Sequence, residues 1–74
     1  MRISADKNDP GFQPGIMSKY DVYFEGTRQE FVVTADVEAG VLVRCMSDEQ
    51  GLIVVDGELV EETLRGDVKL VQRN

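Results

Sequence analysis

Few side chains in this sequence could carry out covalent chemistry. The chain holds one cysteine, Cys45, and no histidine. A reactive thiol needs a lowered pKa and a neighbouring base, which in many enzymes is histidine. Because no histidine is present, and because free cysteines are among the most buried residues in proteins, we interpret Cys45 as a buried structural thiol. The sequence therefore predicts a protein that is not an enzyme, with no catalytic residue and no small-molecule substrate.

Acidic side chains are the next candidates, for a metal ion or for acid–base chemistry. Residues 6–11 invite comparison with a calcium loop, but Pro10 stands where an oxygen ligand belongs and Met17 where the closing glutamate belongs. One cysteine without histidine also excludes a structural zinc site. Asp36 and Glu38 could form an acid–base pair, but no partner nucleophile accompanies them, so we interpret them as solvated loop charges. No metal or cofactor site is predicted.

Two further features could contribute to binding. Residues 65–67 spell the cell-adhesion tripeptide Arg-Gly-Asp, but a glycine-centred turn between two strands accounts for the same residues. Among the aromatic residues, Tyr20, Phe24 and Phe31 are assigned to the core. Tyr23 shares the polar face of its predicted strand, so we take it as the candidate contact residue for a partner.

The charge balance restricts the class of partner. The formal net charge is −6, from 14 acidic and 8 basic side chains. Phosphate backbones and anionic lipid surfaces repel such a chain, so neither nucleic acid nor a membrane is an expected partner. If the carboxylates gather on one face, the protein could instead be an acidic inhibitor or nucleic-acid mimic. A small barrel that binds nucleic acid ranks third, because the basic residues are scattered along the sequence.

The elements that position these residues are predicted to be short β-strands. The most hydrophobic stretch, residues 41–55, has two apolar runs around a polar turn, and the rest of the chain is expected to pack on it. Residues 20–25 alternate apolar and polar side chains, which is the period of a strand with one buried face. The predicted strands span residues 20–25, 29–34, 41–46, 52–55, 58–64 and 67–71.

Glycine-containing turns are expected to connect these strands. Asp56-Gly57 is the strongest hairpin signal, since a type I′ turn needs a positive φ at both central residues. A turn at residues 65–66 is predicted to pair the last two strands, with Glu62 opposite Lys69. Unpaired edges can template another chain, so strands 20–25 and 67–71 are candidates for pairing with a partner or a second copy.

With 74 residues, the chain is expected to form one domain. Prolines and turn residues crowd into residues 1–19, which we predict to be an irregular N-terminal arm. Residues 20–71 are predicted to form a small all-β domain, and residues 72–74 a polar tail. Short connections favour an antiparallel meander of five to six strands. Because strand 41–46 is apolar on both faces, we expect the sheet to curl into a small barrel or a two-layer sandwich.

Three segments carry a resemblance to a known group of proteins. They are the opening Met-Arg-Ile-Ser-Ala-Asp-Lys-Asn-Asp-Pro-Gly, the segment Thr-Ala-Asp-Val-Glu-Ala-Gly at residues 34–40, and the ending from Gly66 to Val71. With these segments the chain resembles short proteins encoded in tailed bacteriophage and prophage gene clusters, although Lys7 and Val37 depart from the commoner residues. The resemblance implies a phage or prophage context and no particular activity.

Together these observations predict a non-enzymatic accessory or structural protein of phage or prophage type. It is expected to act through protein–protein contacts, with a protein partner or by self-association, and without a cofactor. No signal peptide is recognisable, no segment approaches the ~20 apolar residues of a membrane span, and the single thiol suits a reducing compartment. We therefore expect the protein in the cytoplasm of the host cell, with incorporation into a virion as the alternative.

Overall fold

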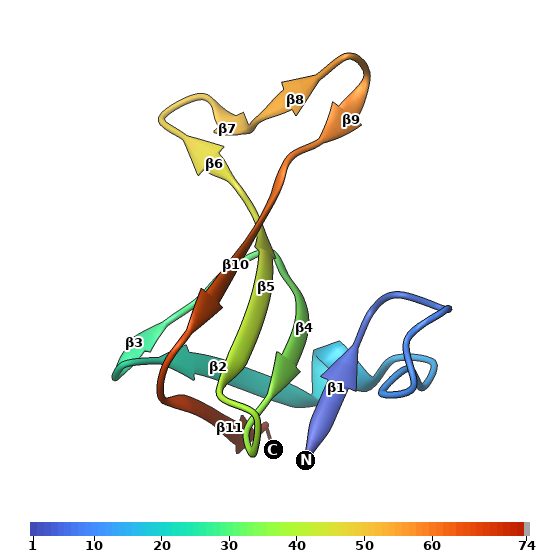
Figure 1. The fold of residues 1–74 in the computed structure, drawn as a ribbon, viewed down its shortest axis with the longest axis vertical. Helices are drawn as coiled ribbons and strands as arrows, with labels where there is room; N and C mark the ends of the chain where they lie inside the picture. Colours follow the sequence, from blue (N-terminus) through green and yellow to red (C-terminus); the bar gives the residue numbers. More distant parts are fainter. Residues whose placement is uncertain (74) are drawn as a thin grey trace.

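The computed structural model describes residues 1–73, and β-strands make up most of its regular structure (Figure 1). Sheet A is antiparallel and contains, in spatial order, β1 (Arg2–Ser4), β4 (Val32–Asp36), β5 (Val41–Cys45) and β10 (Glu61–Arg65). Sheet B contains, in spatial order, β11 (Val68–Gln72), β2 (Tyr20–Phe24) and β3 (Thr27–Arg28). Two short ribbons pair β6 (Ser47–Asp48) with β7 (Gly51–Leu52), and β8 (Val54–Val55) with β9 (Glu58–Leu59). A 3-10 turn, η1 (Ile16–Lys19), leads into β2.

The core lies between sheet A, sheet B and η1. Its buried apolar side chains are Ile3, Ala35 and Leu42 from sheet A, Val22 and Val68 from sheet B, and Ile16 from η1. The predicted all-β fold is confirmed, and the two sheets around one core agree with the sandwich alternative. The closed barrel is wrong, because no strand pairing joins the two sheets within residues 1–73.

The N-terminal segment is more ordered than the prediction of an irregular arm over residues 1–19. Arg2–Ser4 form β1, which pairs with β4, and the Ile3 side chain is fully buried. The buried hydroxyls of Ser4 and Thr34 lie 2.8 Å apart and share a hydrogen bond across this pair. A three-residue strand is too short to show a period, so its sequence gave no signal of pairing.

The predicted pairing of the last two long strands is wrong. β10 pairs with β5 in sheet A, whereas β11 pairs with β2 in sheet B, so the turn at residues 65–66 carries the chain between sheets. Glu62 therefore lies opposite Arg44 rather than Lys69, with 3.3 Å between Glu62 Oε1 and Arg44 Nε. β2 lies in the middle of its sheet, so of the two predicted edge strands only the last one is an edge.

Only residues 32–34 of the predicted strand at residues 29–34 are in a strand, and they belong to β4 of sheet A. β3 ends at Arg28, and the chain enters sheet A at Val32. Between them Phe31 adopts a φ of +59°, an unusual conformation for an aromatic residue, and its ring is half exposed rather than in the core. Tyr20 and Phe24 pack against the core as predicted. This change of sheet is the reason why the strands do not form a simple meander.

The predicted hairpin turn at Asp56-Gly57 is confirmed. Asp56 and Gly57 have φ values of +53° and +79°, as a type I′ turn requires, and the turn joins β8 to β9. Glu25-Gly26 forms the equivalent turn between β2 and β3, with φ values of +50° and +83°.

Residues 72–73 are held against sheet B. Gln72 belongs to β11, and the Arg73 guanidinium donates a 2.7 Å hydrogen bond to Asp21. The predicted polar tail is therefore part of sheet B over this length, and Asn74 lies outside the described residues.

A tight contact makes Gly40 the glycine most sensitive to substitution. Gly40 has a φ of +65°, and an added Cβ would lie 2.7 Å from the backbone oxygen of Gly66. We expect Gly40→Ala to lower the free energy of unfolding by about 1–3 kcal/mol, measured by urea titration. Gly15→Ala is the matched control, because Gly15 has a φ of +75° but open space around it. Equal losses in the two variants would contradict the contact.

Candidate functional site

Residues 46–60 project from the two sheets as a separate element, which we call the β-finger (Figure 1). At its base three backbone hydrogen bonds form a closed cycle. Met46 N donates to Val60 O at 2.7 Å, Ile53 N to Met46 O at 2.9 Å, and Val60 N to Ile53 O at 3.2 Å. The β-finger is therefore a three-way junction from which two short ribbons extend, while the third ribbon is the β5–β10 ladder of sheet A.

The sequence explains this geometry through evenly spaced turns. The junction residues Met46, Ile53 and Val60 are seven positions apart, so each ribbon contains six residues. The β6–β7 ribbon turns at residues 49–50, where the Asp48 side chain accepts a 2.8 Å hydrogen bond from the amide of Gln50. The β8–β9 ribbon turns at Asp56-Gly57. Two turn signals at this spacing fold the segment back on itself twice.

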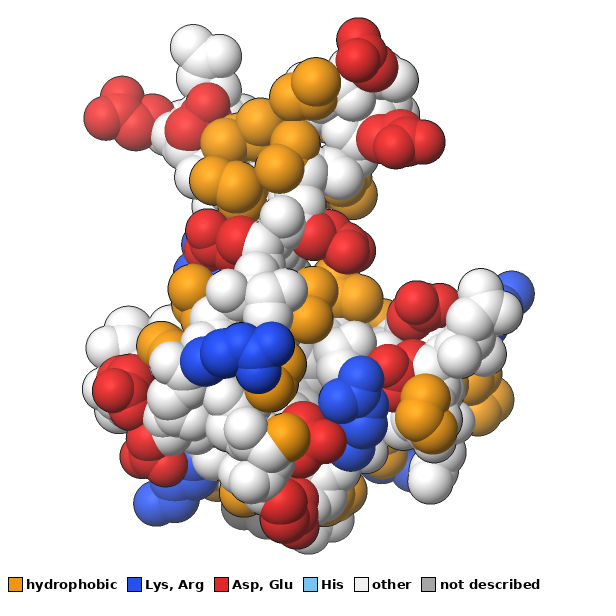
Figure 2. All heavy atoms as spheres, in the orientation of Figure 1, with side chains coloured by type: hydrophobic (Ala, Val, Ile, Leu, Met, Phe, Trp, Pro, Cys, Tyr) orange, Lys and Arg blue, Asp and Glu red, His pale blue; other side chains and the backbone are white. Residues whose placement is uncertain are grey.

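The β-finger exposes apolar side chains that a small protein would normally bury. Relative exposures are 39% for Leu52, 57% for Val54, 54% for Val55 and 48% for Leu59. Figure 2 shows apolar side chains gathered over the β-finger, away from the two sheets. An exposed cluster of large apolar side chains marks an interaction surface more often than a random feature of a surface.

The segment around the β-finger also holds the entire net charge of the chain. Between Arg44 and Arg65 the sequence has six acidic residues and no lysine or arginine. These residues are Asp48, Glu49, Asp56, Glu58, Glu61 and Glu62. The rest of the chain has eight acidic and eight basic side chains, so its formal charge is zero. The result is an apolar surface flanked by carboxylates on a body without net charge (Figure 2).

The dimensions of the molecule agree with a projecting element. The accessible surface area is 5101 Å², whereas a monomer of 8.3 kDa is expected to expose about 4,600 Å². The radius of gyration is 12.2 Å, against about 11.3 Å for a compact domain of this length. The excess surface is the surface that a docking element would offer.

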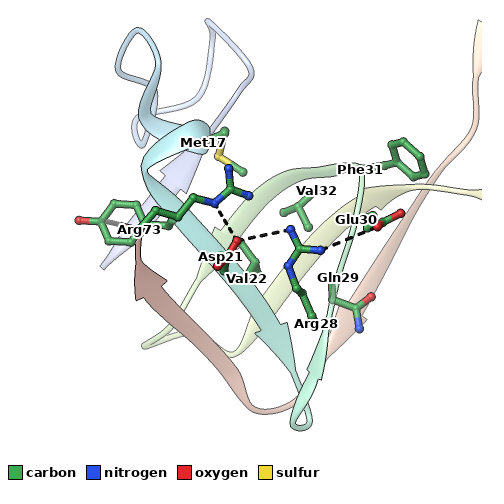
Figure 3. A pocket seen from close by; sticks show the side chains of 10 residues that line it. Met17, Asp21, Val22, Arg28, Gln29, Glu30, Phe31, Val32 and Arg73 are labelled. Atoms are coloured by element: carbon green, nitrogen blue, oxygen red, sulfur yellow. Dashed lines mark hydrogen bonds and ion pairs between the residues drawn. The ribbon is translucent and has the colours of Figure 1, made fainter.

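A cleft beside β2 holds a second cluster of charged groups (Figure 3). Asp21 accepts hydrogen bonds from Arg73 at 2.7 Å and from Arg28 at 3.4 Å, and Arg28 lies 3.8 Å from Glu30. The hydrogen bond from Arg73 is the main reason why the pKa of Asp21 lies below its ordinary value. The cleft has a volume of about 280 Å³, and Phe31 is one of its apolar walls. These charges neutralise one another and join the chain end to sheet B, so we assign the cluster a structural role.

Arg2 organises the third cluster, at the N-terminal loop. Its guanidinium donates hydrogen bonds to both carboxylate oxygens of Asp9, at 2.9 and 2.6 Å, and to Asp36 at 3.3 Å. The hydrogen bond from Arg2 lowers the pKa of Asp9 to about 2, with help from the amide of Gly11. The amide of Ala39 and then Arg2 lower the pKa of Asp36. These contacts hold the loop against β4.

The pKa of Asp9 leads to a prediction about acid stability. Because the folded pKa of about 2 lies below the ordinary 3.8, Asp9 stabilises the fold above about pH 4, and this contribution is lost as the pH falls towards 2. We expect Asp9→Asn to lower the melting temperature at pH 7 and to flatten its decrease between pH 4 and 2. Asp56→Asn, at an exposed turn, controls for the loss of one negative charge. Parallel pH profiles for wild type and Asp9→Asn would contradict the assignment.

The structure places the remaining predicted residues as follows. Cys45 is buried, as predicted, just before the β-finger begins. Tyr23 is half-buried in sheet B between Lys69 and Arg28, and a partner contact there stays a prediction. Gly66 lies in the crossover between the sheets, where an added Cβ would be 2.9 Å from the Phe24 ring, which supports a structural role for residues 65–67.

Sequence interpretation missed the β-finger as a site. It took residues 41–55, which include the apolar run 52–55, as the stretch on which the rest of the chain packs. One signal could have revealed the site, namely the absence of any basic residue between Arg44 and Arg65 beside that apolar run.

Comparison of the chain with protein-family models, curated proteins and solved structures found no match. Within residues 1–73, no three histidine, cysteine, aspartate or glutamate side chains are grouped so that they could hold a metal ion. Over the same residues, no helix has the length and apolar character needed to cross a membrane. Function is therefore inferred from the residues and their geometry.

Proposed function

We propose that this protein is a non-enzymatic interaction module that acts through protein–protein contacts, and that the β-finger is its docking element. The observation that carries this proposal is the exposure of Leu52, Val54, Val55 and Leu59 on an element that projects from the core. Apolar surface gains roughly 25 cal/mol for every Å² removed from water, so a partner that covers these side chains is favoured.

The construction of the β-finger supports a docking role. Its strands are only two residues long, and isolated two-stranded ribbons of this kind are marginally stable in water. The hydrogen-bonded junction at Met46, Ile53 and Val60 connects them to sheet A. A partner that packs on the ribbons would add the contacts that the chain itself does not supply.

The biological context that we propose is a tailed phage or prophage. It rests on the resemblance at residues 1–11, 34–40 and 66–71, and it makes the protein an accessory or structural component. In this context the protein acts in the cytoplasm of the host cell or as part of the virion.

Site-specific photo-cross-linking tests the docking role. A benzophenone amino acid is placed at Val55 on the β-finger, or at the exposed Gln13 of the N-terminal loop as the matched control. After irradiation in bacterial cells that express the protein, we expect discrete protein adducts from position 55 and none from position 13. Equal adducts at the two positions, or none at position 55, would contradict the proposal.

The second candidate is an acidic inhibitor or nucleic-acid mimic of a host enzyme. The grouping of six carboxylates without a basic residue favours this role, since it presents negative charge to a basic groove.

Amide variants of the β-finger separate the two candidates. Replacing Asp48, Glu49, Asp56 and Glu58 with their amides should abolish cross-linking from position 55 only if the partner recognises charge. Nucleic-acid binding, the third prediction, is disfavoured by the same carboxylates.

A further inference from the structure

We propose that the β-finger docks on a second copy of this chain, in a head-to-tail arrangement. The receiving surface is a cleft at the opposite end of the molecule, which we call the basal cleft. Met1, Val37, Glu38 and residues 67–70 line it. This inference rests on the proposed function and names the partner that the docking element would bind.

The elements that line the basal cleft, β11 and the turn between β4 and β5, lie at the far end of the long axis from the β-finger (Figure 1). β11 forms one wall, and the turn between β4 and β5 forms the other. The cleft has a volume of about 430 Å³, whereas a cavity of about 150 Å³ accommodates a group the size of benzene. It therefore has room for an apolar side chain such as Val55 of a neighbouring copy.

Apolar side chains of the basal cleft are exposed in the single chain. Val37 is 39% exposed, and its amide donates a 2.9 Å hydrogen bond to the Met1 carbonyl, which holds these two residues side by side. Met1 is 48% exposed, whereas Leu70 is half-buried and Val68, at the floor of the cleft, is buried in the core. The two ends of the molecule thus carry complementary features, a projecting apolar element and an apolar cleft.

Charge selects this arrangement over pairing of one β-finger with another. Two β-fingers in contact would bring four carboxylates of each chain together, because residues 46–60 contain four acidic residues and no basic residue. All eight basic side chains belong to the rest of the molecule. Lys69 and Asp67 both line the basal cleft, are exposed, and have no ion-pair partner within 4.0 Å among residues 1–73, so the cleft is close to neutral and does not repel the β-finger as a second β-finger would. Glu38 of the cleft is paired with the amino group of Met1.

The backbone of the basal cleft adds a second means of recognition. β11 is an edge strand of sheet B, so its outer side has unpaired backbone groups. β8 and β9 pair only with each other, so each also has an open side. A β-finger in the basal cleft can therefore extend sheet B by strand addition while one side chain of β8, Val55, enters the cleft and Val54 points to the opposite face.

An interface between different surfaces of identical chains either closes into a ring or continues as a filament. Sedimentation equilibrium of the full chain over a concentration series should therefore show species larger than a dimer. Val55→Asp, on the β-finger, and Val37→Asp, in the basal cleft, should each abolish assembly. Both positions are exposed, so the single chains should remain folded by circular dichroism. Phe31→Asn, at an exposed apolar residue outside both surfaces, should assemble like the wild type.

Mixing the two assembly-deficient variants gives the sharpest result. The Val37→Asp chain keeps an intact β-finger, and the Val55→Asp chain keeps an intact basal cleft, so an equimolar mixture should form a one-to-one dimer and nothing larger. A wild-type protein that stays monomeric would overturn this inference. The docking role of the β-finger would then still be tested by the cross-linking experiment at position 55. Assembly that resists Val37→Asp, or a mixture that stays monomeric, would overturn the head-to-tail arrangement.

Discussion

Replacing residues 47–59 with Asn-Gly should leave a folded protein that no longer docks. Met46 N already donates a hydrogen bond to Val60 O next to the end of the β5–β10 ladder, and without Ile53 the amide of Val60 can donate to Met46 O, so a type I′ turn can join the two residues. Shortening the connection from thirteen residues to two lowers the entropy cost of closing it by about 1.7 kcal/mol. The loss of packing at Ile53 offsets part of this gain.

We therefore expect the free energy of unfolding of this variant to change by less than about 2 kcal/mol in urea titration. Assembly, and cross-linking to any partner, should be lost completely, because every exposed apolar residue of the β-finger is removed. A variant that unfolds would show that the β-finger is part of the core. A folded variant that assembles like the wild type would show that another surface docks.

The second large effect should come from the core of sheet A. Leu42→Ala removes a fully buried side chain, and such substitutions cost about 2–5 kcal/mol. The core of a domain this small supplies about 3–5 kcal/mol, so we expect the variant to be largely unfolded at 37 °C. Circular dichroism and thermal denaturation would measure the loss.

Leu52→Ala is the matched control, because it makes the same chemical change on the β-finger. Leu52 is substantially exposed in the single chain, so its truncation should change stability by less than about 0.5 kcal/mol. The contrast tests whether the most hydrophobic segment of the sequence is divided between core and docking surface. Similar losses at Leu42 and Leu52 would contradict that division.

Local signals explain the parts of the fold that sequence analysis predicted. Asp56-Gly57 specifies its turn through backbone conformation, and the alternation over residues 20–25 specifies a strand with one buried face. Neither signal depends on distant parts of the chain. The all-β class followed from these features because each of them limits the local structure on its own.

Long-range pairing could not be predicted in the same way. Glu62 offers a favourable charge pair to Lys69 if β10 pairs with β11 and to Arg44 if β10 pairs with β5, and the structure contains the second pairing. The alternation of apolar and polar side chains along a strand shows which face is buried but not which strand lies beside it. The change of sheet at Phe31 depends on a φ of +59°, which no rule for aromatic residues would predict.

The candidate site was missed for a related reason. A continuous apolar run such as residues 52–55 shows that the side chains will be covered, but it does not show whether the same chain or another molecule covers them. In this protein Val54 and Val55 are beyond the reach of the core, because the junction at the base of the β-finger directs both ribbons away from the sheets.

The central claim is that the β-finger is a docking element that only a partner covers. Amide hydrogen exchange tests this claim most directly. In dilute, single chains the amides of Val54, Val55 and Leu59 should exchange rapidly, whereas those of Ala35 and Leu42 are protected by sheet A. In the assembled or partner-bound state, the β-finger amides should slow by at least roughly tenfold. The claim would be contradicted if the β-finger amides of the single chain were as protected as the amide of Leu42. It would also be contradicted if binding left the exchange rates of the β-finger amides unchanged.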